Sequence, residues 1–370
     1  MQKLKKIARQ VHLWLGLVSG LLVMVVCLSG CLYAFQYEIK QQFFSYYTIP
    51  SDEQEVDKLS LQDLLLAYKK QSNNDVLRIY DFVAPQKSTI LKTSKDGEFY
   101  YSFLHPYTGA LLQEHAYKHD FFHLVMSLHR NFLLGKKYRW TVGVVVLVFM
   151  FSLITGLVLW WPKRWKILKT SKGRLAHFGI KQNVRLQRRI YDLHNVLGFY
   201  ASFLLFIMAI TGLNWTFKWM ENLLYVAVTF EQKIPLAKPT IDSTTFDLSS
   251  LDLAKKQMDY TQTNRGMFIY KLPTTSTVPL QVSAYPDLDS YGSSDHYYIH
   301  PRTAELLDKH LDKDKTRGTK YRAMYYDIHT GSVFGILGKV VVFTSSLIGA
   351  SLPLTGFLIW WRKRKKNAYL

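Results

Sequence analysis

Cysteine is nearly absent from this sequence of 370 residues, which contains only Cys27 and Cys31. Two cysteines in one apolar run provide neither a disulfide framework nor a cysteine metal site. Acidic residues are also scarce, with 27 Asp and Glu against 47 Lys and Arg and a formal net charge of +20. Such a charge indicates contact with either nucleic acid or a membrane surface. No recognisable nucleic-acid-binding module accompanies it, so we expect no nucleic-acid partner.

The apolar residues are concentrated in long runs, although the mean hydropathy of the whole chain is near zero. A helix needs roughly 20 mostly apolar residues to cross a bilayer. Tryptophan pairs mark the interface at two of the run ends, Trp160-Trp161 and Trp360-Trp361. The sequence therefore predicts four transmembrane helices, at residues 11–36, 138–161, 193–219 and, with a histidine-bearing segment before it, 329–361.

Three short segments fix the predicted orientation. Residues 1–10, 162–192 and 362–370 carry 19 of the 47 basic residues but only one of the 27 acids. By the positive-inside rule these segments are cytoplasmic, as are both termini. We therefore expect a multi-pass protein of a bacterial inner membrane, embedded in lipid, with the loops 37–137 and 220–328 outside.

The end of the first apolar run has a second interpretation. Leu28–Cys31 resembles a lipoprotein cleavage site behind a basic start. However, the run is longer than a signal-peptide core, and the third span repeats the pattern at Ile210–Leu213 without a cysteine. We expect this segment to stay a transmembrane helix, which the intact mass of the mature protein would test.

The chain is an internal duplication. The first and third spans run from a histidine to a Ser/Thr-Gly pair with identical spacing, His12 to Gly30 and His194 to Gly212. The second and fourth do the same with a longer spacing, His129 to Gly156 and His329 to Gly356. A repeat of this kind determines the fold interpretation. The sequence thus predicts two tandem helix–extramembrane domain–helix units.

The two outer loops also match each other. His105–Leu112 corresponds to His300–Leu307, and each Pro-x-Thr tract predicts a turn between two strands. Each loop also contains an amphipathic helix, predicted at 59–68 and 251–258, followed by strand-like runs. These strands are predicted at 76–82, 89–91 and 99–104 in the first loop, and at 267–272, 280–285 and 296–299 in the second. We predict a small α+β domain in each loop, one helix on an antiparallel sheet.

Four duplicated histidines sort into pairs by orientation. His12 and His194 begin spans that start inside, whereas His129 and His329 precede spans that start outside. Polar groups at the membrane boundary are often functional, and neutral imidazole is a good axial ligand for haem iron. Two histidines per haem would fill both axial positions and favour electron transfer. The alternative is that they are interfacial residues that only cap helices or bridge headgroups.

The neighbours of these histidines fit a flat macrocycle. Gly16 and Gly198 lie four residues past His12 and His194, on the same helix face, where a missing side chain leaves room. Arginines would pair with haem propionates: Arg9 and Arg188 or Arg189 inside, and Arg130 outside.

Other histidines have simpler interpretations. His105 and His300 belong to the strand–turn motif, so we expect structural roles for both. His115, His119 and His123 are spaced by four residues and would share one face of a helix, where they could bind a metal. They have no evident counterpart in the second half, which makes metal binding a secondary hypothesis.

Three segments together resemble the PepSY-associated transmembrane family: the His-x-x-x-Gly of span one, Leu128–Gly135 and Thr155–Pro162. The outer loops resemble PepSY domains, although at the second hairpin His300 replaces the usual acid and Ala304 the usual glycine. Some members of this family are iron-regulated inner-membrane ferric-siderophore reductases with b-type haems. The resemblance implies two haems b here, with the four paired histidines as axial ligands of the iron.

The resulting hypothesis is an inner-membrane dihaem electron-transfer protein. A cytoplasmic reductant or membrane quinol would be the donor, and a ferric siderophore or other ferric chelate outside would be the acceptor. Outer aromatics would line the acceptor site: Phe121, Phe122, Tyr325 and Tyr326. One alternative is a non-catalytic PepSY membrane protein that binds peptides or partner proteins. Another is a transporter subunit, which the scarcity of buried acids and broken helices in the spans disfavours.

Overall fold

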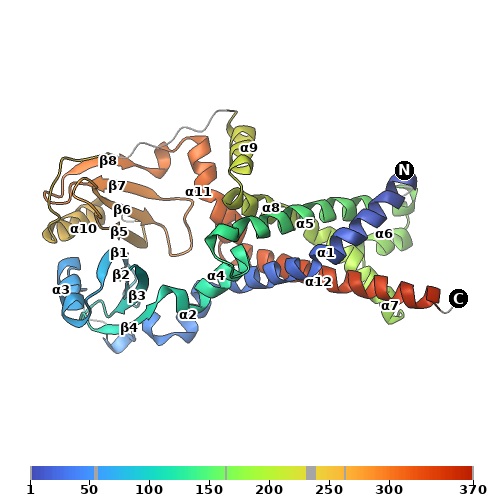
Figure 1. The fold of residues 1–370 in the computed structure, drawn as a ribbon, viewed down its shortest axis with the longest axis horizontal. Helices are drawn as coiled ribbons and strands as arrows, with labels where there is room; N and C mark the ends of the chain where they lie inside the picture. Colours follow the sequence, from blue (N-terminus) through green and yellow to red (C-terminus); the bar gives the residue numbers. More distant parts are fainter. Residues whose placement is uncertain (1, 54–56, 163–164, 231–238, 262–263, 369–370) are drawn as a thin grey trace. The chain divides into compact units, whose positions relative to one another are not determined.

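The computed structural model describes residues 2–53, 57–162, 165–230, 239–261 and 264–368. It contains two compact units (Figure 1). The first, which we call the helical unit, comprises Met1–Ala34, Leu124–Leu223 and Ile328–Leu370. The second, the sheet unit, comprises Phe35–His123 and Leu224–Asp327.

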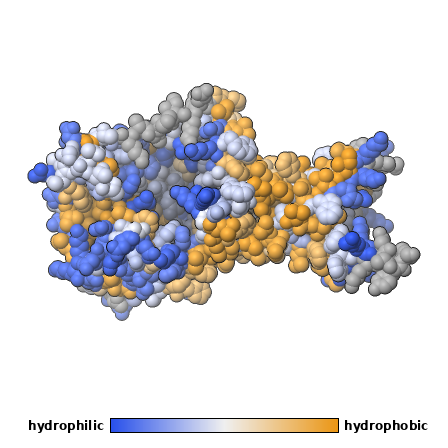
Figure 2. All heavy atoms as spheres, viewed as in Figure 1, coloured by the Kyte–Doolittle hydropathy of each residue, from blue (hydrophilic) through white to orange (hydrophobic). Residues whose placement is uncertain are grey.

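Four long apolar helices form the helical unit: α1 (Gln2–Ala34), α5 (Arg139–Trp160), α8 (Gly198–Thr216) and α12 (Gly335–Ala368). Their length and composition suit membrane spans, which confirms the four transmembrane helices predicted from the sequence. Large apolar side chains on them are exposed, such as Val18 and Phe203 at 76% and 72%. Figure 2 shows hydrophobic residues covering the long helices, with hydrophilic residues at the end where the termini lie.

Small residues bring these helices close together. Helices α1 and α8 each pack against both α5 and α12, which closes a four-helix bundle. A Cβ atom at Gly20 would lie only 2.9 Å from the Pro353 side chain, so α1 and α12 need a glycine there. Close approach at small residues is the usual way membrane helices gain packing energy. Leu153, Ala201 and Leu205 form the buried core between α5 and α8.

Shorter segments complete the connections on the helical unit's basic side: η5 (Trp165–Lys169), α6 (Ser171–Phe178), α7 (Leu186–Asp192) and η6 (Leu193–Leu197). The last of these is a single π-helical turn that leads straight into α8. Helix α1 starts well before the predicted span, because the basic N-terminal residues continue the same helix.

Two further helices precede the second and fourth spans: α4 (Phe121–Asn131) and α11 (Arg317–Thr330). Sharp breaks separate each from its span. After α4 the backbone is left-handed at Phe132 and Leu133, and η4 (Lys136–Tyr138) follows. After α11 it is left-handed at Gly331, and η8 (Ser332–Phe334) follows. The sequence predicted a histidine-bearing segment before the fourth span, within residues 329–361, and in the structure Gly331 separates the two.

The sheet unit contains one antiparallel sheet of eight strands in the order β4-β3-β2-β1-β5-β6-β7-β8. The first loop supplies β1 (Asp75–Phe82), β2 (Thr89–Lys95), β3 (Glu98–Leu104) and β4 (Leu111–Ala116), and the second supplies β5 (Met267–Lys271), β6 (Leu280–Tyr285), β7 (Asp295–Ile299) and β8 (Leu306–His310). Strand β2 outruns its prediction because an Asp96-Gly97 turn, left-handed at both residues, lets it continue into β3.

One face of this sheet carries the main core. Helices α3 (Leu61–Gln71) and α10 (Ser249–Thr261) supply residues such as Leu65 and Leu251 to a cluster with the strands. A second cluster of mostly aromatic residues includes Tyr47, Phe82 and Phe103. The remaining helices of the unit are α2 (Gln36–Phe43), η1 (Ser45–Tyr47), η2 (Ser51–Glu53), η3 (Tyr117–His119) and η7 (Asp312–Asp314). Helix α9 (Lys218–Thr229) begins in the helical unit and ends in the sheet unit.

The two loops share this sheet, whereas the sequence predicted one small helix-on-sheet domain in each. Strands β1 and β5 would be edge strands of two separate halves, with unpaired backbone N–H and C=O groups. They pair with each other instead, with Tyr80 opposite Ile269. Each loop therefore contributes half of one sheet, with its helix on the common face.

Candidate functional site

The helical unit brings the four duplicated histidines together in the two pairs predicted from the sequence. The rings of His12, on α1, and His194, in η6, have centroids 6.1 Å apart at 78°. The rings of His129, on α4, and His329, on α11, are also 6.1 Å apart, at 67°. The two halves of the chain thus contribute one histidine each to both pairs.

Each histidine ring packs against a Ser/Thr-Gly pair of another helix, and we call this pair the seat of the histidine. Nδ1 of His12 lies 3.0 Å from the Ser152 carbonyl oxygen and 3.1 Å from Thr155 Oγ1. A Cβ atom at the next residue, Gly156, would lie 3.2 Å from the ring's Cε1. The hydroxyl and carbonyl therefore hold one ring nitrogen, while the glycine leaves space for the ring.

The same seat recurs for the other three histidines. Nδ1 is 2.9 Å from Thr355 Oγ1 in His194, 2.9 Å from Thr211 Oγ1 in His329, and 3.3 Å from Ser29 Oγ in His129. The following glycine faces Cε1 in every case, at 3.1–3.4 Å from its Cβ position: Gly356, Gly212 and Gly30. Each half of the chain contains two antiparallel spans. The histidine at the start of each span packs against the Ser/Thr-Gly pair at the end of the other span of the same half.

This seat was missed in the sequence, where the Ser/Thr-Gly pairs served only as markers of the repeat. The signal was nevertheless present. Paired spans run antiparallel, so the start of one lies level with the end of the other. His12 at the start of the first span must therefore lie level with Thr155-Gly156 at the end of the second.

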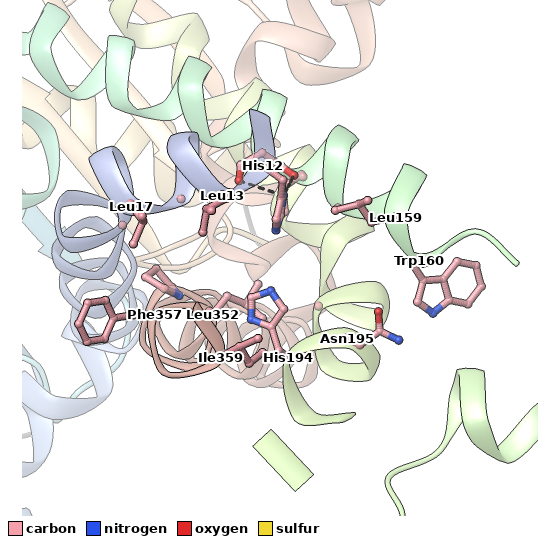
Figure 3. Close-up of a pocket in the computed structure, with 18 of the residues that line it drawn as sticks. His12, Leu13, Leu17, Leu159, Trp160, His194, Asn195, Leu352, Phe357 and Ile359 are labelled. Atoms are coloured by element: carbon pink, nitrogen blue, oxygen red, sulfur yellow. Dashed lines mark hydrogen bonds between the residues drawn. The ribbon is translucent and has the colours of Figure 1, made fainter. Parts of the chain in front are cut away.

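The seats fix the tautomer of the imidazole rings. A carbonyl oxygen can only accept, so Nδ1 of His12 must donate to Ser152 and Nδ1 of His129 to the Val26 carbonyl at 2.9 Å. A neutral ring protonated at Nδ1 keeps a lone pair on Nε2. No hydrogen bond reaches Nε2 of the four histidines within the described part of the chain. Figure 3 shows the second ring nitrogen of His12 pointing toward His194.

The spacing of each pair suits a metal ion between the rings. An imidazole nitrogen binds a metal at about 2.0–2.1 Å and lies about 1.1 Å from the ring centroid, so two rings on opposite sides of one ion have centroids about 6.3 Å apart. Both pairs, at 6.1 Å, are close to this separation. Among the described residues, no group of three or more His, Cys, Asp or Glu is arranged so that it could hold a metal ion. Two imidazoles alone are too few for a structural zinc site, whereas haem iron takes just two axial ligands from the protein.

A cavity of about 380 Å³ adjoins the His12–His194 pair (Figure 3). This volume lies in the usual range of small-molecule sites. Gly16 and Gly198 both line it, and nothing lies within 4 Å of a Cβ atom built at Gly16. The two glycines singled out in the sequence therefore border the space where a ligand of these histidines would sit.

The basic residues proposed to pair with haem propionates differ in whether they line this cavity. Arg9 lines the cavity, and so does Lys363 of α12, which was not predicted from the sequence. Arg188 is instead engaged by Asp192 at 2.9 Å and does not line the cavity. Arg130 is half-buried beside His129 in the chain. In the sequence, Lys363 belongs to the basic C-terminal segment, whose charge indicates only the orientation in the membrane.

The π-helical turn η6 places His194. This turn contains one more residue than an α-helical turn, and such turns are frequent at functional sites. His194 lies in this turn, just before α8, and its imidazole ring reaches Thr355 on α12.

The metal hypothesis for His115, His119 and His123 is not supported by their placement. His115 lies on β4, His119 in η3 and His123 on α4, so they do not share a helix face. His115 stacks on Phe103 with its Nε2 3.5 Å from Asp120, and His123 packs on the Tyr117 ring. The strand alignment also supplies a counterpart for His115 that the sequence analysis overlooked, His310 on β8.

The turn histidines and outer aromatics have structural contacts. Nδ1 of His105 and of His300 each accept two backbone N–H groups of the following turn, at 3.2–3.3 Å. Among the aromatics, Phe122 and Tyr325 are 1% and 4% exposed and therefore cannot form an open surface. Phe121 is 53% exposed, and Tyr326 accepts a hydrogen bond from Gln36.

Comparison with known proteins identifies the family. No curated protein matches this chain. The model of the PepSY-associated TM region matches residues 9–363, which includes all four spans, both histidine pairs and the whole sheet unit. The chain is therefore a multi-pass membrane protein that belongs to the PepSY-associated transmembrane family.

Proposed function

We propose that this protein binds two haems b, one in each histidine pair, and transfers electrons across the bacterial inner membrane to a ferric chelate outside. The observation that carries the proposal is the repeated geometry of the two pairs: 6.1 Å between ring centroids and Nδ1 held by a Ser/Thr-Gly seat. A haem with two histidine ligands supplies one-electron transfer and has no open position for oxygen.

Four histidines of the chain would supply the axial ligands of the two haems. His12 and His194 would hold the first haem, and His129 and His329 the second. Each seat orients its imidazole before the cofactor binds, and the hydrogen bond at Nδ1 raises the basicity of Nε2. Gly16 and Gly198 leave space at the first site, where Arg9 and Lys363 would balance the charge of the propionates.

The two sites would lie near opposite faces of the bilayer. His12 and Gly30, which seats His129, are 18 residues apart on the single helix α1. Such a helical segment rises about 27 Å, close to the thickness of the hydrocarbon layer. The basic excess around the termini and the α5–α8 connection supports a cytoplasmic location for the His12–His194 pair by the positive-inside rule. A cytoplasmic reductant or membrane quinol would therefore be the donor, and a ferric siderophore or similar chelate the acceptor.

The test is the haem content of the purified protein. We expect a reducible b-type absorbance that corresponds to two haems per chain. His194→Ala and His329→Ala should each remove one haem, because each deletes one axial ligand of a different pair. His119→Ala, an exposed histidine outside both pairs, is the matched control and should retain both.

A folded protein without haem absorbance would contradict this proposal. The sheet unit would then be left as the functional part, which is the alternative of a non-catalytic PepSY protein that binds peptides or partners outside. Loss of both haems in the His119→Ala control would likewise argue against specific ligation by the two pairs.

A further inference from the structure

Two side chains in the described part of the helical unit contain buried polar atoms without a hydrogen-bond partner: Asn214 on α8 and Arg139 at the start of α5. Asn214 is only 5% exposed, and both its amide nitrogen and its amide oxygen are unpartnered. In Arg139 the unpartnered atom is Nε. Burial of a polar group without a hydrogen bond is unfavourable for folding. A partner from outside the chain would offset this cost.

Asn214 lies on the face of α8 that holds His329. Thr211, whose hydroxyl contacts Nδ1 of His329, is three residues earlier and therefore on the same helix face. The residue after Asn214 is Trp215, and its ring centroid is 5.3 Å from that of His329. The unpartnered amide is thus within one helical turn of two residues that contact a proposed iron ligand.

Arg139 lies on the face of α5 that meets the same end of α8. A Cβ atom at Gly143, four residues later in α5, would lie 2.6 Å from the side chains of Thr216 and Phe217. Residues four apart share a helix face, so Arg139 is one turn from this close contact. Both unpartnered groups therefore belong to the end of the bundle that carries the histidine pair of the second haem.

The duplication shows that the fold does not require the amide. Leu32 occupies the position equivalent to Asn214, two residues after the seat glycine in each half. A cation, in contrast, recurs: Lys339 is equivalent to Arg139, ten residues after the paired histidine of its half, and is 2% exposed. In the predicted orientation both cations lie at the outer ends of their spans, where the positive-inside rule does not account for them. Ionisable residues within spans are usually functional.

The unpartnered groups define the chemistry of the missing partner. The Nε–H group of arginine and the Nδ2–H groups of asparagine are donors, so the partner must accept hydrogen bonds. The guanidinium charge favours an anionic oxygen over a neutral one, and a carboxylate matches its geometry. The amide oxygen of Asn214 can accept from a water molecule bound to the same carboxylate.

We propose that Asn214 and Arg139 bind the propionate carboxylates of the haem held by His129 and His329. This inference rests on the proposed function and assigns residues to a haem for which the sequence predicted only Arg130 as a propionate partner. The haem would supply the acceptor oxygens that the described part of the chain does not. Its binding would remove the cost of the buried amide.

The rate of haem loss from a chain that contains only the second haem tests the inference. His194→Ala removes the first haem and serves as the parent. The full-length protein in phosphatidylcholine nanodiscs is loaded with haem b or with its dimethyl ester, in which both propionates are uncharged. Excess apomyoglobin then captures the released haem, and the change in Soret absorbance gives the rate.

We expect Asn214→Leu and Arg139→Gln, each added to this parent, to lose haem b about tenfold faster, since each removes a hydrogen bond to a charged group. The dimethyl ester should leave both variants at nearly the rate of the parent, because the charge that these residues recognise is already absent. An anionic lipid headgroup as the true partner would give no difference between haem b and its ester.

Two further measurements separate binding from a structural role. Lys137→Gln removes an exposed cation two residues before Arg139 and should lose haem b at the parent rate. Haem-free Asn214→Leu should melt no lower than the haem-free parent, because leucine replaces a buried amide that has no partner. A damaged fold would instead lower the melting temperature and speed the loss of both porphyrins.

Loss of haem b at the parent rate by either variant would overturn the inference, as would equal acceleration for haem b and its ester. Equal acceleration in Lys137→Gln would reduce the effect to surface charge and would overturn it too. In each of these cases, two haems per chain in the wild type would leave the haem proposal intact. A colourless wild-type protein would instead contradict the haem proposal itself, and this inference with it.

Discussion

At the residue scale, the Ser/Thr-Gly seats are the feature that organises the histidine pairs. A histidine at a membrane boundary could adopt several rotamers and either tautomer. Here a carbonyl and a hydroxyl on a neighbouring helix select one of each, and the adjacent glycine allows the ring to approach. Hydrogen-bond partners that hold the far nitrogen of a metal-binding imidazole orient the ring and tune the metal that it binds.

Under the proposed function, removal of one seat hydroxyl should change one haem without the other. In Thr211→Val the side chain keeps its size but loses the contact to Nδ1 of His329. Weaker hydrogen bonding makes the imidazole less basic, so the reduction potential of that haem should rise. Redox titration followed by absorbance would measure the shift. Thr211→Ser, which resembles the natural Ser29 seat, should restore the wild-type potential, and unchanged titration of Thr211→Val would contradict the role of the hydroxyl.

At the element scale, the breaks before the second and fourth spans are as important as the spans. Helices α4 and α11 carry His129 and His329, and a left-handed turn separates each from the following helix. The break lets α11 present His329 to α8 while α12 continues through the bundle.

Gly331 is the position at which this break is most constrained. Its φ of +80° is left-handed, and a Cβ atom there would lie 2.3 Å from the Gly338 carbonyl oxygen. Gly331→Ala should destabilise the protein by about 3 kcal/mol or more, since strain and a backbone clash add. Thermal unfolding in detergent would measure this loss of stability.

Gly97→Ala provides the control for backbone strain alone. Gly97 has a similar φ of +79° but nothing within 4 Å of its Cβ position. It should cost only about 1–2 kcal/mol. Equal melting temperatures for Gly331→Ala and Gly97→Ala would show that the contact with Gly338 does not constrain the turn.

At the scale of the whole molecule, the two halves of the duplicated chain complete each other in two ways. In the helical unit, one histidine from each half completes each pair. In the sheet unit, one strand from each half completes the sheet at the β1–β5 junction. The halves are therefore complementary parts of one protein and not two independent modules.

Hydrogen exchange offers a direct check on the shared sheet. The backbone amides of β1 and β5, such as those of Tyr80 and Tyr270, lie in the middle of eight strands and should be among the slowest to exchange. Two separate domains would make these strands edges, with unpaired amides that exchange fast. Labelling of the full-length protein, followed by peptic digestion and mass spectrometry of the peptides, distinguishes the two cases, with the terminal strands β4 and β8 as internal references for edges.

The sequence by itself determined the spans, the repeat and the identity of the paired histidines. Apolar runs and charge asymmetry act through the transfer of single segments from water to lipid, so they can be read locally. Equal spacings such as His12–Gly30 and His194–Gly212 express the duplication without any tertiary contact.

Only the tertiary structure decided which residues meet. The seats of the histidines, the inclusion of Lys363 in the cavity, the engagement of Arg188 by Asp192 and the joining of β1 to β5 all depend on helix packing and strand pairing between distant segments. Such contacts form because packing satisfies polar groups and buries area over the whole fold, which no local pattern records.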